Sequence, residues 1–414
     1  MAKRKIGLGH KSKEGVKKVK VEKPIEQPAE EQVEPEGTNI ADIESLYRTW
    51  DGDETILNGI INECSRLESA GNSDSDEVKC LLVFAIIDMS SFKAEEREDW
   101  LHMAKEKIEE IDGKVWKSLS QCKLILNELS VDWVNNLDVD GNFIGKEMEG
   151  SVIELLKAFK KKFNLVLKNV EKDKVVGPLF IKVLDGFDAL LNLIDNFGVV
   201  DEGDEVDSDA EEEEGIELDQ NHPLFEIKQS DEFDNYWREA MEKYGALIDD
   251  VEESDLVNVT SIDGKDVETD VDVLLDLKRD VHKKIGQSYL MESESPLAFY
   301  TSYAFAEGGE EEEDEEEEDA PTDEELPHEV KEARDDAKRL ILTAIEHLKS
   351  YQSQEDPQSW VDLAEAEISY GNLLTVDSKE QEEWYKKAEI KLRRANDVGH
   401  GKWQDILTSL LGKE

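Results

Sequence analysis

The spacing of apolar residues from Ile40 onward constrains the fold of this chain more than any other feature of its sequence. Trp100, Ala104, Ile108 and Ile111 recur at intervals of three or four residues, which places them on one face of an α-helix. The same spacing predicts further helices over residues 81–89, 115–129, 152–170, 175–197, 233–251, 271–291, 330–351, 360–374, 382–396 and 402–411. No convincing run of alternating β-branched residues occurs between them. The sequence therefore predicts an all-α fold class.

Small and large residues are spaced in the C-terminal helices as paired repeat helices require. Trp360, Leu363 and Ala364 match the first helix of a tetratricopeptide (TPR) repeat, with Ala in place of Gly, and Gly371 follows near the turn. A small, a large and a small residue recur in two series, as Ala337, Ile341 and Ala344 and as Ala388, Leu392 and Ala395. We expect a degenerate TPR/HEAT-like helical-repeat array. A generic helical bundle remains the alternative, because the copies are separated by irregular distances.

Two runs of acidic residues interrupt the helical pattern. Residues 201–214 contain ten acids and no base, and residues 307–325 contain fourteen acids and no base, in a chain whose net charge is -53. Blocks of like charge repel one another and do not pack, so we expect loops that emerge between helices. Ser208 and Thr322 each precede an acidic residue by three positions, which makes them candidate sites for an acidophilic kinase.

These changes in composition predict the division of the chain into segments. We expect residues 1–38, which are rich in proline and charge, to be a disordered basic tail, followed by three helical regions. The predicted segments are a tail at 1–38, N-terminal helical repeats at 39–200, an acidic loop at 201–221, middle helical repeats at 222–306, an acidic loop at 307–327 and C-terminal TPR-like helices at 328–414.

The strong negative charge restricts the classes of partner. An acidic surface repels phosphates and anionic lipids, so we expect no direct binding of nucleic acid or membrane by the folded body. Three cysteines, Cys64, Cys80 and Cys122, are too few and too far apart for a disulfide framework. The longest uninterrupted apolar run, residues 81–87, is too short to cross a bilayer. We therefore expect a soluble intracellular protein.

The motifs that would support catalysis or a cofactor each lack a required member. The segment HEVKE, which begins at His328, has Glu332 where a zinc-protease helix needs a second His. Asp138, Asp140 and Asn142 begin an EF-hand spacing, but Phe143 occupies the position that needs Gly for the turn. We expect no enzyme activity, no metal and no cofactor.

The first 23 residues are basic, with nine Lys or Arg against two Glu. Two clusters within this arm have the spacing of a bipartite nuclear-import signal, in which a flexible linker lets both clusters reach an import receptor. The candidate signal residues are Lys3, Arg4, Lys5, Lys17, Lys18 and Lys20. The alternative is a generic basic tail that contacts RNA weakly or lies on the acidic loops of the chain itself.

Several segments together resemble the fungal enhancer of translation termination family. They are MAKRKIGLG at residues 1–9, ILNGIINEC at 56–64, WVDLAEAEISYGNLL at 360–374, EQEEWYKKAE at 380–389 and GHGKWQDIL at 399–407. The resemblance extends over almost the whole chain and is densest at its two ends. The basic motif of the family corresponds to Lys3, Arg4, Lys5, Gly7 and Gly9.

The resemblance implies a nuclear, non-enzymatic adaptor. Its fission-yeast relative is described as a negative regulator of a 2-oxoglutarate- and iron-dependent prolyl-hydroxylase-like dioxygenase. The expected function is binding of this dioxygenase, correct translation termination, and the translation and transcription regulation of the hypoxia response. The partners expected are the dioxygenase, a nuclear import receptor, and ribosome-associated or basic proteins. The alternative function is an acidic histone or ribosomal-protein chaperone, because glutamate runs screen basic clients.

Four aromatic residues near the C-terminus are candidates for contact with a protein partner. They are Trp360, Trp384, Tyr385 and Trp403. Large aromatic side chains are enriched at the energetic centres of protein interfaces. The same residues at helical spacing also fit a place in the core, and the sequence leaves both roles open.

Overall fold

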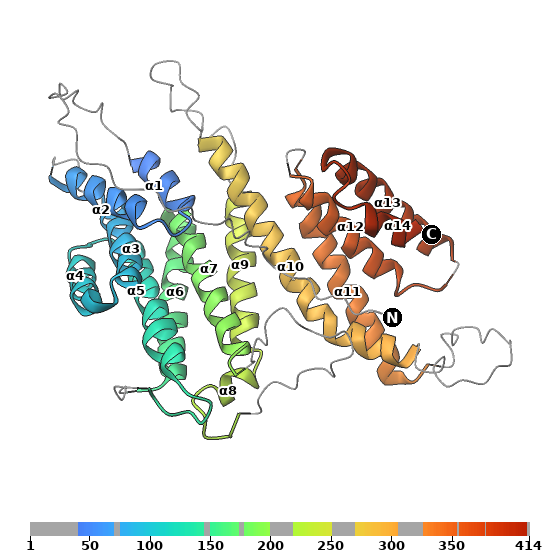
Figure 1. Cartoon of the computed structure of the whole chain (residues 1–414), viewed down its shortest axis with the longest axis horizontal. Helices are drawn as coiled ribbons and strands as arrows, with labels where there is room; N and C mark the ends of the chain where they lie inside the picture. Colours follow the sequence, from blue (N-terminus) through green and yellow to red (C-terminus); the bar gives the residue numbers. More distant parts are fainter. Residues whose placement is uncertain are drawn as a thin grey trace, which may run out of the picture. The chain divides into compact units, whose positions relative to one another are not determined.

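The computed structural model describes residues 40–69, 75–144, 150–173, 178–198, 218–250, 270–304, 326–353, 356–376 and 378–411. These residues form an all-α protein, which confirms the predicted fold class (Figure 1). The helices are α1 (Ile40–Arg48), α2 (Glu54–Ser69), α3 (Asp76–Phe92), α4 (Arg97–Glu109), α5 (Lys114–Asn127), α6 (Val152–Asp173), α7 (Pro178–Asp195), α8 (Phe225–Lys228), α9 (Glu232–Asp249), α10 (Asp270–Ala304), α11 (His328–Tyr351), α12 (Gln358–Gly371), α13 (Lys379–Val398) and α14 (Gln404–Leu411).

Most predicted helices begin and end within three residues of the observed ones. The apolar spacing did not predict α1, α2 or α8, however, and α3 begins five residues before the predicted range 81–89. A π-helical turn, η2 (Glu128–Trp133), and a 3₁₀ turn, η3 (Val134–Asn136), continue directly from α5. Helix α10 runs to Ala304, although the apolar spacing predicted an end near residue 291. It continues through Pro296, a residue that normally interrupts the helical hydrogen-bond ladder. Leu297 and Tyr300, which follow this proline, pack against a buried core.

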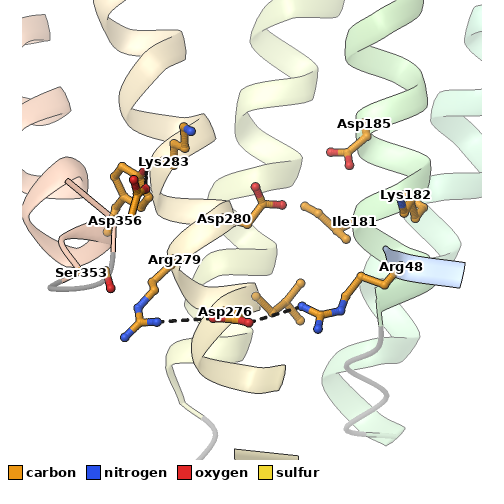
Figure 2. Close-up of a pocket in the computed structure, with 12 residues that line it drawn as sticks. Arg48, Ile181, Lys182, Asp185, Asp276, Arg279, Asp280, Lys283, Ser353 and Asp356 are labelled. Atoms are coloured by element: carbon orange, nitrogen blue, oxygen red, sulfur yellow. Dashed lines mark hydrogen bonds and ion pairs between the residues drawn. The ribbon is translucent and has the colours of Figure 1, made fainter. Parts of the chain in front are cut away.

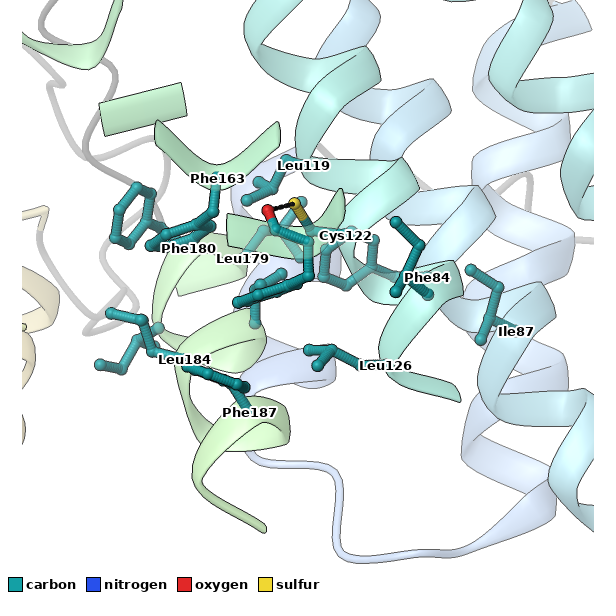
Figure 3. Packing of buried hydrophobic residues seen from close by; sticks show 14 of the residues in the cluster. Phe84, Ile87, Leu119, Cys122, Leu126, Phe163, Leu179, Phe180, Leu184 and Phe187 are labelled. Carbon is teal, nitrogen blue, oxygen red and sulfur yellow. Dashed lines mark hydrogen bonds between the residues drawn. The ribbon is translucent and has the colours of Figure 1, made fainter. Parts of the chain in front are cut away.

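Aromatic rings fill the core of the N-terminal helices (Figure 3). On α6, Phe159 and Phe163 are fully buried on one face, because positions four residues apart share a face of a helix. The Phe159 ring lies 4.5 Å from that of Phe187 on α7, and Phe180 stacks on Tyr244 of α9 at 4.2 Å. Full burial of one such ring stabilises the fold by about 1.5–3 kcal/mol. This core therefore holds α6, α7 and α9 together.

Small residues characterise the two cores of the C-terminal helices. The alanines of the predicted small-large-small series are fully buried, and so are Ile341 and Leu392 between them. Gly371 on α12 lies so close to Tyr385 on α13 that a Cβ atom would stand 2.7 Å from the ring. Alanine and glycine thus let successive helices approach closely, as the sequence pattern predicted.

Helix α10 belongs to both parts of the fold and lies beside α9 and α11 (Figure 1). Val281 and Ile285 in its first half are buried in the N-terminal core. Leu290 and Tyr300 in its second half pack against the core that α11 and α12 share. At the contact with α11, Gly286 faces Leu348, and a Cβ atom on this glycine would stand 2.8 Å from the leucine.

All three cysteines lie within the described part of the chain. Cys64, Cys80 and Cys122 are buried and form no disulfide. Burial raises the pKa of the Cys64 thiol to about 12, so the thiol stays protonated at neutral pH. Among the helices of the described residues, none is both long and apolar enough to cross a membrane.

Several predictions concern residues outside the described part of the chain. These are the basic tail at 1–38 with its import signal, most of the acidic loops at 201–221 and 307–327, and the candidate phosphorylation sites Ser208 and Thr322. They stay predictions.

Candidate partner-binding surface and charged pocket

Trp360 is buried beneath a cation from the next helix. It lies on α12 with 4% of its surface exposed, in a core that also contains Ala388, Leu392 and Trp403. The guanidinium of Arg394, on α13, stands 4.0 Å from the centre of the indole ring. A cation at this position is attracted to the negative face of the ring. Trp360 therefore packs in the core and orients an exposed Arg394.

Trp384 and Tyr385 are half-buried neighbours on α13. The Trp384 ring lies 4.8 Å from that of Tyr370 on α12, and the Lys387 ammonium stands 3.8 Å from its centre. The Tyr385 hydroxyl donates a hydrogen bond to Asn372 Oδ1 at 2.7 Å. Both rings thus have a buried side against α12 and a second side toward the surface. Of the four predicted aromatic residues, these two remain partly accessible.

Trp403 lies at the turn between α13 and α14. Its side chain is 8% exposed and belongs to the same core as Trp360. Its backbone N–H donates to Asn396 Oδ1 at 3.1 Å, and the Lys402 ammonium stands 4.9 Å from the ring centre. The structure thus brings Trp360 and Trp403 together in one core and places Trp384 in the neighbouring one.

The cations on these rings are functional candidates that the sequence analysis did not single out. Residues 384–403 contain six Lys or Arg and two acids, in a chain with a net charge of -53. This local excess of positive charge could have been found from the sequence. The sequence could not show, however, that Lys387 and Arg394 lie over tryptophan rings.

A buried ion pair fixes α13 against α12. Lys391 Nζ contacts both carboxylate oxygens of Glu367, each at 2.8 Å, and Glu367 is only 1% exposed. Both oxygens of the buried carboxylate are thereby paired, which such a group requires in a medium of low dielectric constant. The pair sets the position of α13 and of the cations on its outer face.

A second candidate site is a charged cavity of about 450 Å³ between α1, α7 and α10 (Figure 2). Its charged lining consists of four cations and four carboxylates, which are Arg48, Lys182, Arg279 and Lys283 and Asp185, Asp276, Asp280 and Asp356. The formal charge of the lining is therefore balanced, so the cavity favours neither anions nor cations.

Ion pairs among these residues neutralise much of the charge of the lining. Asp276 on α10 lies 3.6 Å from Arg48 on α1 and 3.4 Å from Arg279. Lys284, beside the cavity, pairs with Asp185 on α7. Burial lowers the pKa of Lys182, while the nearby Asp185 partly offsets this effect. The described lining contains no thiol or imidazole, and its candidate nucleophiles are the Ser353 and Tyr351 hydroxyls and the lysine amines.

The near-miss motifs have structural roles. Asp138 Oδ1 accepts the backbone N–H groups of Asp140 at 3.0 Å and Asn142 at 2.8 Å, and the hydrogen bond from Asn142 is the main cause of its lowered pKa. His328 and Glu332 pair at 3.3 Å on an exposed face of α11. The described residues contain no group of three or more His, Cys, Asp or Glu placed to hold a metal ion.

The sequence of this all-helical, charge-rich chain matches a known protein family. The family model described as "Nuclear pore complex subunit Nro1" matches residues 1–411. The chain belongs to the Nro1 family. The match extends over both the N-terminal helices and the C-terminal surface, and the resemblance inferred from the sequence is confirmed.

Related fungal proteins of this family match over nearly their full length. A Scheffersomyces stipitis protein named Enhancer of translation termination 1 is 29% identical over all of both chains. A Candida tropicalis protein of the same name is 32% identical and covers 91% of this chain and 90% of its own. The solved structure titled "Structure of S. pombe nuclear import adaptor Nro1" is 12% identical, with a TM-score of 0.44, and covers 87% of this chain and 94% of its own.

Proposed function

We propose that this chain is a non-enzymatic nuclear adaptor. In this proposal it binds a 2-oxoglutarate- and iron-dependent prolyl-hydroxylase-like dioxygenase. It is required for correct translation termination and takes part in the regulation of hypoxic gene expression. The observation that carries the proposal is membership of the Nro1 family along residues 1–411, together with relatives named for translation termination.

The geometry of the described residues supports an adaptor. The charged cavity has a balanced formal charge, and the incomplete metal-site motifs have local structural roles. The C-terminal helices instead present cations ordered by aromatic rings on an exposed face. Such a surface binds a protein partner and needs no catalytic groups for this.

A paired experiment tests the proposed function. The full chain and the dioxygenase of the same organism are mixed and passed over a size-exclusion column, and we expect a complex. In cells that lack the gene, we expect increased readthrough of a stop-codon reporter, restored by the full chain. Separate elution together with normal readthrough in the deletion strain would contradict the proposal.

Nuclear location is part of the proposal and rests on the basic arm. The arm supplies two basic clusters for a nuclear import receptor. Replacement of Lys17, Lys18 and Lys20 by Ala removes the second cluster, and we expect a fluorescent fusion to lose nuclear accumulation. Unchanged accumulation would show that the import signal lies elsewhere.

The acidic runs favour one second function, a chaperone of histones or ribosomal proteins. The fourteen acids at residues 307–325 would screen a basic client. Deletion of this segment separates the two functions, because an adaptor without a chaperone role keeps its dioxygenase complex and never binds histones. Histone binding that disappears with the segment would support the second function.

Two further proposals concern the organisation of the chain. We keep the division at residues 38, 200, 221, 306 and 327, which limited proteolysis tests by the positions of first cleavage. Modification of Ser208 and Thr322 by an acidophilic kinase is tested by phosphopeptide mapping, and the absence of both phosphopeptides from cells would exclude it.

A further inference from the structure

An exposed isoleucine on α13 stands among four cations. Ile390 is 60% exposed. Its four closest neighbours on the helix surface are the residues three and four positions away, and all four are basic. They are Lys386, Lys387, Arg393 and Arg394, each exposed. We call Ile390 and these four residues the α13 patch.

Most of the positive charge of the patch is available to a partner. Arg393 pairs with Glu389 along the helix at 2.6 Å. Lys386, Lys387 and Arg394 have no ion pair with a carboxylate of the described residues. On the same face, Glu383 and Asp397 follow two turns away from Ile390 in either direction, so they mark the ends of the patch.

The cations of the patch are already ordered. Lys387 lies over Trp384 and Arg394 over Trp360, and both rings pack in cores of the C-terminal helices. The buried Glu367–Lys391 pair, beside Lys387 and Arg394, fixes α13 against α12. A partner would therefore lose less conformational entropy in binding these side chains than in binding free lysines on a surface.

The chemistry of the patch fits an acidic peptide with one large apolar side chain. Carboxylates of the peptide would pair with the cations, and its apolar residue would cover Ile390. Single-stranded RNA fits less well. RNA needs open aromatic faces on which bases stack, and here Lys387 and Arg394 occupy the ring faces. An exposed aliphatic side chain at the centre also gives a phosphate backbone nothing to bind.

We propose that the α13 patch is a docking surface for a partner segment in which Asp or Glu residues surround one large apolar residue. This inference rests on the proposed adaptor function in one respect, that the chain has a protein partner. The chain repels acidic segments over most of its surface, because its net charge is -53. An acidic partner would therefore be directed to this patch.

Fluorescence anisotropy with the full chain tests the proposal. The probe is a labelled helical 15-residue peptide with a central Leu and Glu at the four positions three and four residues away. We expect saturable binding that weakens as salt increases, because surface ion pairs are screened. The double variant K387E/R394E should bind the probe at least about tenfold more weakly, and I390A about threefold more weakly.

A matched variant controls for the change in net charge. K105E/K161E reverses two exposed lysines on α4 and α6 that form no ion pair with described residues, and we expect binding within about twofold of the unchanged chain. Circular dichroism checks that each variant folds. Equal losses in both double variants would overturn the proposal, because the effect would then come from net charge alone. Absence of binding to the unchanged chain would overturn it as well.

Further binding experiments test two other occupants of the α13 patch. If a 12-nucleotide poly(U) RNA binds through Lys387 and Arg394 and the peptide does not, the patch is a nucleic-acid site and the proposal is wrong. If the peptide binds only after deletion of residues 307–325, the acidic run of the chain itself occupies the patch, which also excludes an external partner. Peptide binding without any dioxygenase complex would support this inference and contradict the proposed function.

Discussion

Large aromatic rings fill the core of the N-terminal helices, whereas alanine and glycine form the contacts between the C-terminal helices. Phe159, Phe163 and Phe187 are fully buried in the first region. In the second region, Ala388 and Ala395 lie on the buried face of α13, and the Trp384 and Tyr385 rings of the same helix are only half-buried. The two regions therefore differ in where their aromatic residues are placed.

The cations that lie over aromatic rings also differ between the two regions, and this difference bears on the partner surface that we propose. In the N-terminal region, Lys123 over Phe84 and Lys160 over Tyr236 each form an ion pair with a carboxylate. Lys387 and Arg394, over Trp384 and the buried Trp360, have no ion pair with a carboxylate of the described residues. The ordered cations of the C-terminal region thus keep more of their charge for a partner, which supports our proposal of a C-terminal surface.

The largest expected effect is loss of an aromatic ring from the N-terminal core. F159A removes a fully buried ring that stacks near Phe163 and Phe187, and we expect a loss of about 3–5 kcal/mol in the free energy of unfolding. Hydrogen exchange should increase in α6 and α7 and remain unchanged in α12 and α13. The control F92A removes a ring that is 42% exposed and should cost less than about 1 kcal/mol. Equal exchange in both regions would show that they unfold together.

The second prediction concerns the ion pair that holds α13. K391M leaves the Glu367 carboxylate buried without its partner, and we expect a loss of about 2–3 kcal/mol in the free energy of unfolding. Hydrogen exchange should rise in α12 and α13 only. R393M, which breaks an exposed pair on the same helix, should cost less than about 0.5 kcal/mol. Similar costs for the two variants would contradict the structural role of the buried pair.

The third prediction uses two glycines to compare how tightly helices pack in the two regions. G286A places a Cβ atom 2.8 Å from the fully buried Leu348, and we expect a loss of about 1–2 kcal/mol from overpacking in thermal denaturation. G245A, on α9, places its Cβ 3.3 Å from Val281, where a small shift suffices. That variant should be neutral, since alanine also favours the helix. A larger loss of stability in G245A than in G286A would contradict our conclusion that the tight small-residue contacts lie on the C-terminal side.

The smallest effect is a dependence on pH in the N-terminal region. Burial, reinforced by the adjacent Glu77, raises the pKa of Glu44 from 4.5 to about 8. The folded chain therefore keeps this proton while the unfolded chain releases it, so this group contributes a stability that falls as pH rises from about 4.5 to 8. E44Q should flatten this dependence and raise stability at pH 8 by about 1 kcal/mol. Urea denaturation of E44Q and of the unchanged chain at pH 5 and pH 8 measures this difference, and an equal dependence on pH in both would contradict the prediction.

Much of the fold was predictable from local spacing. The small-large-small series at Ala337 and Ala388 predicted close helix contacts, which the structure confirms by full burial of these alanines. The second half of α10 was not predictable in this way. Ser and Glu residues from 292 to 295 and then Pro296 hide the helical pattern, and the helix is held there by its contact with α11.

The candidate surface was only partly predictable. Helical spacing identified the aromatic residues but could not separate the core role of Trp360 from an exposed one. The decisive contact joins Trp360 to Arg394, thirty-four positions along the chain, and depends on how α12 and α13 pack. Helical spacing in the sequence places Ile390 at the centre of a basic face, but the exposure of its side chain depends on which side of α13 is buried.

Lysine footprinting of the complex tests the central claim, that the α13 patch contacts an acidic partner. The full chain, free and in its complex with the dioxygenase, is acetylated briefly, and the modified lysines are quantified by mass spectrometry. We expect Lys386 and Lys387 to become at least about fivefold less reactive in the complex while the exposed Lys105 and Lys161 stay unchanged. A stable complex in which Lys386 and Lys387 react as they do in the free chain would contradict it.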